Sequence, residues 1–121
     1  MTTSKQANVK TAAAALGDEL VRSTGSGAIS ELIQVDKPTK LLGVKLHLSA
    51  AATTGNLLIS TIGTRSGLDA YNTVLLNADM NGVQDIHFSD PVFLGKGDDI
   101  AIAFTNADGH TYGLTVIYAD A

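Results

Sequence analysis

The stretch Val92-Phe-Leu-Gly-Lys-Gly-Asp-Asp-Ile-Ala-Ile-Ala-Phe104 decides the fold of this 121-residue chain. After its Gly-Lys-Gly-Asp turn, large apolar residues alternate with alanines from Ile100 to Phe104, so the large side chains share one face. A period of two is the pattern of a β-strand that buries one face. The stretch therefore predicts a short strand over 92–94, a tight turn, and a longer strand over 99–105.

The same alternation recurs on both sides of this stretch. Val44, Leu46 and Leu48 share one face, and the last segment alternates in the same way from Leu114 to Tyr118. Outside the first 17 residues, no window of helical length carries a helical apolar stripe, although Leu75–Met80 is ambiguous and could form one helical turn. The predicted strands lie near Glu19–Arg22, Ala28–Asp36, Lys40–Ser49, Asn56–Ile62, Thr73–Asn77, Val83–Phe88, Val92–Leu94, Asp99–Thr105 and Thr111–Ala119.

Glycine-containing turns separate these segments. Examples are Thr54-Gly55-Asn56, Asn81-Gly82 and Ala107-Asp108-Gly109-His110. Asp-Gly is a strong hairpin signal because glycine accepts positive φ, so we expect the last of these turns to join two paired strands. About eight short strands at this spacing predict an all-β fold, an antiparallel sandwich or barrel.

Composition excludes several classes of function. The chain has 12 acidic and 8 basic residues, a net charge of -4, which argues against nucleic-acid binding because that requires dense lysine and arginine. It has no cysteine, so disulfides, thiolate catalysis and cysteine-ligated metals are excluded. We find neither a secretory signal pattern nor an apolar stretch of spanning length, and therefore expect no membrane partner.

Charge divides the chain into two parts. Residues 1–17 contain Lys5 and Lys10, no acidic residue and few large apolar side chains, so they cannot build a core of their own. We predict an N-terminal arm over 1–17 that stays flexible until it is bound, followed by a single β-sandwich domain over 18–121. Two interpretations of this segment stay open, a frayed terminus and a basic arm that orders on an acidic partner surface.

Catalytic motifs are absent or incomplete. Gly63-Thr-Arg-Ser66-Gly67 resembles a nucleophile elbow, but its serine is one position late and lacks a strand-to-helix setting. His47 and His87 alternate with apolar neighbours and should project from outer sheet faces, whereas His110 belongs to the last turn. Their spacing matches no metal-ligand pattern. We expect neither enzyme activity nor a metal or organic cofactor.

The carboxylates leave one alternative open. Asp79-x-Asn81-Gly82-x-x-Asp85 places oxygen ligands at short spacing, as a calcium loop does. However, an EF-hand loop requires glycine at its sixth position, where Gln84 stands. The match to a calcium loop is therefore partial, and a calcium site stays an open alternative.

Four stretches between Leu41 and Ala119 resemble the small single-jelly-roll proteins that decorate the heads of tailed bacteriophages, called cement or decoration proteins. These stretches are Leu42-Gly-Val-Lys-Leu-His-Leu-Ser49, Thr54-Gly-Asn-Leu-Leu-Ile-Ser60, Val92–Phe104 and Asp108-Gly-His-Thr-Tyr-Gly-Leu-Thr-Val116. The resemblance covers about two-thirds of the chain and marks the fold better than the role. It implies a jelly-roll sandwich and provides no catalytic residues.

The resemblance also implies a role. A decoration protein binds the outside of the capsid and bridges neighbouring capsomers, which implies the major capsid protein as partner and a homo-oligomer, either a dimer or a trimer. It implies a location on the virion surface after synthesis in the bacterial cytoplasm. In the predicted arm, Lys5 and Lys10 would pair with acidic capsid residues, whereas Val9 and Leu16 would fill apolar depressions.

Two rival interpretations remain. A ligand- or carbohydrate-binding module of a phage fibre or adhesin would place its site in loops at one end of the sandwich, such as Ser49–Gly55 and Gly63–Asn72. An enzyme on a jelly-roll scaffold, such as a cupin, would need a histidine-rich metal site inside the barrel, which the histidine positions do not provide.

Overall fold

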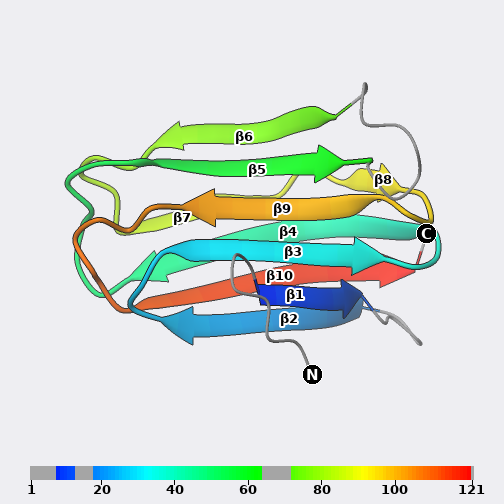
Figure 1. Cartoon of the computed structure of the whole chain (residues 1–121), viewed down its shortest axis with the longest axis horizontal. Helices are drawn as coiled ribbons and strands as arrows, with labels where there is room; N and C mark the ends of the chain where they lie inside the picture. The colour runs from blue at the N-terminus through cyan, green and yellow to red at the C-terminus, as the bar shows by residue number, and fades with distance from the viewer. Residues whose placement is uncertain (1–7, 13–17, 64–71, 121) are drawn as a thin grey trace.

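A computed structural model describes residues 8–12, 18–63 and 72–120, which form ten strands and no helix (Figure 1). The strands are β1 (Asn8–Ala12), β2 (Asp18–Gly25), β3 (Ile29–Val35), β4 (Thr39–Leu48), β5 (Asn56–Ile62), β6 (Thr73–Asp79), β7 (Asp85–Phe88), β8 (Val92–Leu94), β9 (Asp99–Phe104) and β10 (Tyr112–Asp120). Strands β2 to β10 agree closely with the nine strands predicted from alternation, whereas β1 was not predicted. In this described part of the chain, no helix is long and apolar enough to cross a bilayer.

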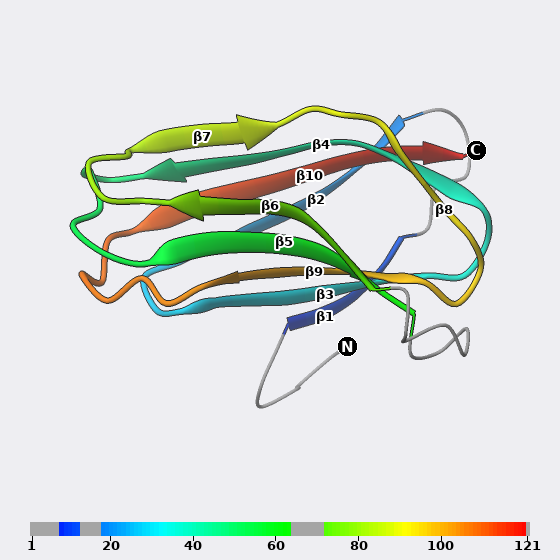
Figure 2. The ribbon, with the colours of Figure 1, turned by 90° about the horizontal axis from the view of Figure 1, so that it is seen from above.

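The strands form two sheets that pack face to face (Figure 2). Sheet A has the order β1-β3-β9-β5-β6, and sheet B has the order β2-β10-β4-β7, with β8 also paired to β4. Neighbouring strands are antiparallel except for β1, which is parallel to β3. The all-β antiparallel sandwich predicted from the sequence is confirmed.

The connectivity is that of a jelly roll. From β2 to β5 and from β6 to β10 the chain repeatedly crosses between the sheets, so that β5 and β6 are the one sequential pair bonded to each other among the described strands. Strands β7 and β8 both pair with β4 and together fill one edge position. The two sheets thus offer eight jelly-roll positions, with β1 added at the edge of sheet A.

One turn behaves differently from its prediction. The Asp-Gly turn was expected to join two paired strands, but β9 lies in sheet A and β10 in sheet B. Asn106 and Gly109 both have positive φ, at 48° and 67°, so the chain does turn sharply here. The connection 105–111 is longer than a two-residue hairpin and crosses the roughly 10 Å between packed sheets.

The ambiguous segment Leu75–Met80 is not helical, because β6 extends to Asp79 and pairs with β5. The register between these strands shifts between Ile59 and Ser60. Such a bulge sets two residues of one strand against one of the other, which interrupts strict alternation and explains the ambiguous sequence pattern.

Aliphatic side chains from the inner faces fill the space between the sheets. Ile33, Ile59 and Ile100 are fully buried, and Phe104 is buried as well. The outward positions predicted for His47 and His87 are confirmed, since both side chains are exposed. The core therefore holds the two outer faces apart.

The predicted arm includes a strand that alternation did not reveal. Residues 8–12 form β1, whose backbone pairs in parallel with β3 from Glu31 to Val35. The remainder of 1–17 lies outside the described residues. The division into an arm over 1–17 and a domain over 18–121 stays a prediction.

Candidate functional site

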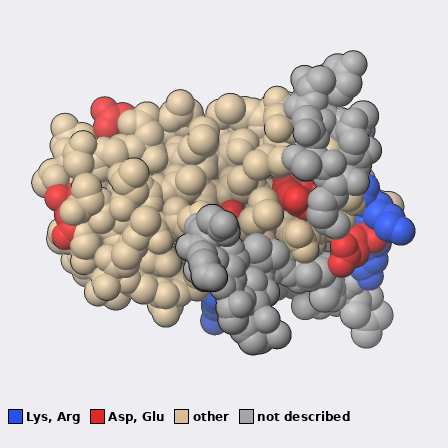
Figure 3. All heavy atoms as spheres, viewed as in Figure 1, with Lys and Arg blue, Asp and Glu red and all other residues tan. Residues whose placement is uncertain are grey.

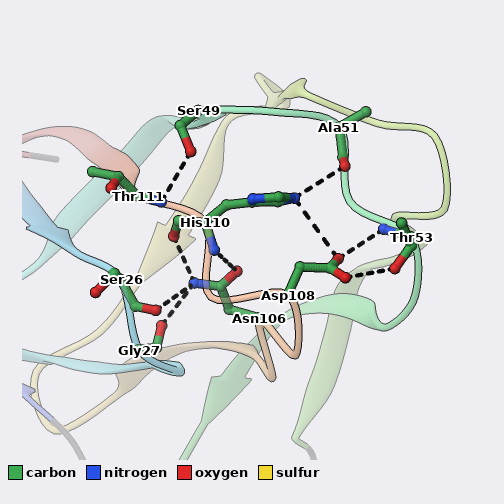
Figure 4. Close-up of polar contacts among 9 residues, drawn as sticks. All are labelled: Ser26, Gly27, Ser49, Ala51, Thr53, Asn106, Asp108, His110 and Thr111. Carbon is green, nitrogen blue, oxygen red and sulfur yellow. Dashed lines mark hydrogen bonds and ion pairs between the residues drawn. The ribbon is translucent and has the colours of Figure 1, made fainter.

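Three connections from distant parts of the sequence meet at one end of the sandwich (Figure 4). The side-chain amide of Asn106 donates to the backbone oxygens of Ser26, Gly27 and His110 at 3.3, 3.0 and 2.9 Å. Its own oxygen accepts a hydrogen bond from the His110 backbone N–H at 3.2 Å. Because Asn106 is only 5% exposed, this amide fixes the connections 26–28 and 105–111 to each other.

A carboxylate fixes the third connection at the same end. Asp108 accepts hydrogen bonds from the Thr53 backbone N–H at 2.8 Å and from the Thr53 hydroxyl at 2.6 Å. The Thr53 side-chain bond, followed by the backbone bond, lowers the pKa of Asp108 below its usual range. His110 Nε2 lies 3.2 Å from the Ala51 carbonyl oxygen and 3.9 Å from Asp108.

This cluster of Thr, Asp and His side chains is built for rigidity. A general base needs a pKa near the working pH, whereas the Asp108 carboxylate is held ionised by bonds to Thr53. The Thr53 hydroxyl donates its hydrogen bond to that same carboxylate. The cluster therefore holds the connection that contains Ala51 and Thr53 against the connection 105–111.

The two loops proposed for a ligand site lie at opposite ends of the same strand. Gly55 immediately precedes β5 and Gly63 immediately follows it, so the strand separates them by roughly 20 Å. Part of the second loop, residues 64–71, lies outside the described residues. The expectation that Ser49–Gly55 and Gly63–Asn72 share one end of the sandwich is wrong.

The outer side of sheet A carries an uncharged face. Its outward side chains, paired across β6, β5 and β9, are Leu58, Ser60, Val74, Asn77, Ala101 and Ala103. Val74 is 58% exposed, which is unusual for a large aliphatic side chain in a small domain. Figure 3 shows this side as a broad area without lysine, arginine, aspartate or glutamate over β5, β6 and the later part of β9, with acidic groups around it.

A hollow of about 540 Å³ lies at the loop end of the uncharged face. Leu58, Ala103 and Phe104 supply much of its apolar lining, and Asn56 and Asn77 lie at its polar side, joined by a 2.9 Å amide hydrogen bond. Gly55 also lines it, at φ +102°, and an added Cβ there would lie 3.0 Å from the Phe104 ring. Glycine therefore lets the chain approach Phe104 closely enough to shape the hollow.

The outer side of sheet B has the opposite character. Strand register aligns Arg22 of β2, Thr115 of β10, Lys45 of β4 and His87 of β7 in one row across the sheet. We call these four residues the basic row. A parallel row beside it contains Thr24, Gly113, His47 and Asp85. These rows border a hollow of about 450 Å³ that is lined by Lys45, His47, Asp85, Ile86, His87, Gly113 and Thr115, among others.

A contact between a histidine and an aspartate and an exposed aromatic residue complete this side. The His47 Nδ1 and the Asp85 carboxylate are 2.5 Å apart. On the outward side of the β4–β8 pair, the Lys40 ammonium lies 5.8 Å from the centre of the Phe93 ring. Phe93 is 72% exposed. Exposed aromatic residues beside cations are frequent anchors in protein interfaces.

The residues predicted to contact a capsid are only partly described. Val9 and Lys10 belong to β1, where their backbones pair with Leu32 and Ile33. Lys5 and Leu16 lie outside the described residues. The structure thus brings Val9 and Lys10 to the edge of sheet A, and their role stays a prediction.

The calcium alternative gains no ligand cluster from the fold. Asp79 accepts a hydrogen bond from the Asn81 backbone N–H at 3.0 Å, and Asp85 contacts His47 on the neighbouring strand β4. Within 8–12, 18–63 and 72–120, no three His, Asp or Glu side chains are grouped closely enough to hold a metal ion.

The basic row could not be predicted from the sequence. Arg22, Lys45, His87 and Thr115 are far apart in the chain, and none belongs to a recognisable motif. Alternation does predict that Lys45 and His87 face outward, but it does not predict which strands are neighbours. Only the jelly-roll order and the register place the four residues side by side.

Comparison with known proteins supports the fold. No family model matches the chain, and no curated protein matches it. Among solved structures, the chain is similar to the pre-peptidase C-terminal domain of collagenase from Bacillus anthracis, with a TM-score of 0.51 and 7% identity over 95% of this chain and 99% of that one. At this identity the likeness concerns the fold alone.

A weaker likeness involves a chain in the structure of infectious bursal disease virus, Gx strain. The TM-score is 0.33 at 11% identity, and the match covers 86% of this chain and 30% of that one. A TM-score this low carries no argument about fold or function.

Proposed function

We propose that this chain is a structural virion protein that binds the outside of a bacteriophage capsid and stabilises it by bridging neighbouring capsomers. The observation that carries the proposal is a rigid jelly-roll body with two outer faces of different chemistry, one uncharged and one bearing the basic row. Bridging requires two separate contacts held at a fixed distance, and a closed β-sandwich provides this geometry.

The stretches that resemble decoration proteins coincide with structural elements of this body. They cover most of β4 and β5, all of β8 and β9, and the first half of β10. These strands come from both sheets and include the centre of each. The resemblance therefore concerns the framework that positions both faces, and the proposal adds a role for the faces themselves.

The size of the uncharged face suggests how binding would work. Three strands about 4.8 Å apart and about 20 Å long offer roughly 300 Å² in projection. A standard protein interface uses about 800 Å² per partner, so this face alone supports a weak contact. Many copies on one head, or a dimer or trimer of the chain, would compensate through avidity. The major capsid protein is the proposed partner, and no enzymatic step is proposed.

Heating of phage heads tests this function. Undecorated heads are warmed with and without saturating protein, and the release of DNA is followed with an intercalating dye. We expect release at a higher temperature in the presence of the protein, because each bridge must break before capsomers separate. An unchanged release temperature despite bound protein would contradict the stabilising role.

The hollow beside Gly55 favours a second candidate, a ligand- or carbohydrate-binding module of a phage fibre or adhesin. Its volume of about 540 Å³ lies in the range of small-molecule sites, and its amide groups offer hydrogen bonds. A glycan array with the native chain and an Ala103→Lys variant separates the candidates. Glycan binding that the variant abolishes would favour this second function.

A further inference from the structure

The basic row is unexpected on a chain with a net charge of -4. We propose that the outer face of sheet B is a docking surface for carboxylates on an acidic protein surface. If the proposed function holds, that surface belongs to the capsid, and this identification of the partner rests on the proposed function. The docking chemistry itself follows from the row.

The geometry of the row suits several carboxylates at once. Strands lie about 4.8 Å apart, so the backbone positions of Arg22 and Lys45 are about 10 Å apart and His87 is about 5 Å further on. Thr115 stands between Arg22 and Lys45 and offers a hydroxyl. Alternate side chains of one partner strand are about 7 Å apart, so two neighbouring acidic residues could each reach a cation.

The hollow gives partner side chains room to enter. Gly113 lies between Thr24 and His47 in the second row, and a Cβ at Gly113 would meet no atom within 4 Å. The surface is therefore open beside Thr115, where a carboxylate would pass between Arg22 and Lys45. Arginine binds carboxylates with two parallel hydrogen bonds, which makes Arg22 the expected specificity contact.

The charge distribution orients such a partner. In the two rows the acidic residue is Asp85, and its carboxylate contacts the His47 ring. Arg22 and Lys45 thus present positive charge on a molecule that is negative as a whole. At physiological salt, charge acts over about 8 Å, so an acidic surface is attracted to this face and repelled by the acidic remainder.

Protein carboxylates fit the observations better than nucleic acid does. Nucleic acid binding gains affinity from many phosphate contacts, and the row supplies two permanent cations. An extended polyanion would also meet the remainder of a chain whose net charge is -4. Phe93 is 72% exposed beside Lys40, five positions along β4 from Lys45, and offers an apolar anchor of the kind that dominates protein interfaces.

The test compares two variants with the same loss of charge. Arg22→Gln/Lys45→Gln removes two charges from the face. The control, Lys37→Gln/Lys96→Gln, removes two charges from the connections next to β3 and β9, where the Lys37 ammonium contacts Asp120 at 3.3 Å. All four residues are exposed, so both variants should fold, which circular dichroism checks.

Binding to poly-L-glutamate, to single-stranded DNA of equal charge and to undecorated heads is then measured. We expect the face variant to bind polyglutamate and heads about tenfold more weakly than the control variant does. Equal head binding by both variants would overturn the docking surface and leave the proposed function intact.

The other outcomes are also decisive. One outcome is that the native chain does not bind heads, while the face variant binds polyglutamate more weakly than the native chain does. In that case the docking surface stands with another acidic partner, and the proposed function fails. If polyglutamate binding is equal in both variants, or if single-stranded DNA binds more tightly than polyglutamate, the inference is overturned.

Discussion

Substitution of Asn106 tests the account of the loop end most sharply. Asn106→Ala removes an amide that serves three backbone carbonyls and one N–H, from a side chain that is 5% exposed. It also places alanine at φ 48°. The lost and unsatisfied hydrogen bonds cost about 2 kcal/mol, and the left-handed backbone adds about 1 kcal/mol. We therefore expect the free energy of unfolding to fall by about 3 kcal/mol.

Asn106→Gly separates the two contributions. Glycine accepts φ 48° without strain, so this variant should lose only the hydrogen-bond contribution, about 2 kcal/mol. Urea unfolding followed by circular dichroism measures both losses. For a chain of this size, 1 kcal/mol shifts the melting temperature by about 4 °C, so the alanine variant should melt about 12 °C lower.

Two results would refute this reasoning. An alanine variant within about 0.5 kcal/mol of the native chain would show that the amide bonds contribute little. Equal losses for alanine and glycine would show that the positive φ carries no cost at position 106. Binding to heads is expected to survive in both variants at temperatures where they remain folded, because Asn106 lies outside the two outer faces.

Three further predictions concern other parts of the molecule. Gly55→Ala should destabilise the fold by about 2 kcal/mol in urea unfolding, because its φ is +102° and the new Cβ would lie 3.0 Å from the Phe104 ring; a neutral effect would contradict this packing. The hydrogen bonds from Thr53 lower the pKa of Asp108 in the folded state, so their stabilisation is present above the ordinary aspartate range and is lost as the pH falls through the lowered pKa; Asp108→Asn should lack this part of the acid dependence in unfolding measured from about pH 6 to about pH 2. Deletion of residues 2–16, which removes β1 from the edge of sheet A, should leave a folded domain that attaches to heads much more weakly, and normal attachment would count against a role for the arm.

Much of the fold could be predicted from local pattern. Alternation places Val44, Leu46 and Leu48 inside and Lys45 and His47 outside, and the structure confirms each of these positions. This works because a half-buried strand imposes a period of two on its own residues, independently of its neighbours. Glycine turns then mark where strands end, although they do not say which sheet the chain enters next.

The remaining features depend on long-range pairing. The short strand β1 lacks a clear apolar alternation, and its parallel partner β3 is not adjacent in sequence. In the sequence, Asn106 looks like an ordinary turn residue. Its side-chain amide, however, donates hydrogen bonds to the backbone oxygens of Ser26 and Gly27, which lie 80 and 79 positions earlier in the chain. The basic row needs the register of four strands, which the whole core determines. Local pattern cannot contain this information.

Sedimentation with undecorated heads tests the central claim most directly. The purified chain is mixed with heads at increasing ratios, and the protein that sediments with them is quantified. The account predicts binding that saturates at a fixed number of copies per head. Protein that stays in the supernatant at every ratio would contradict it.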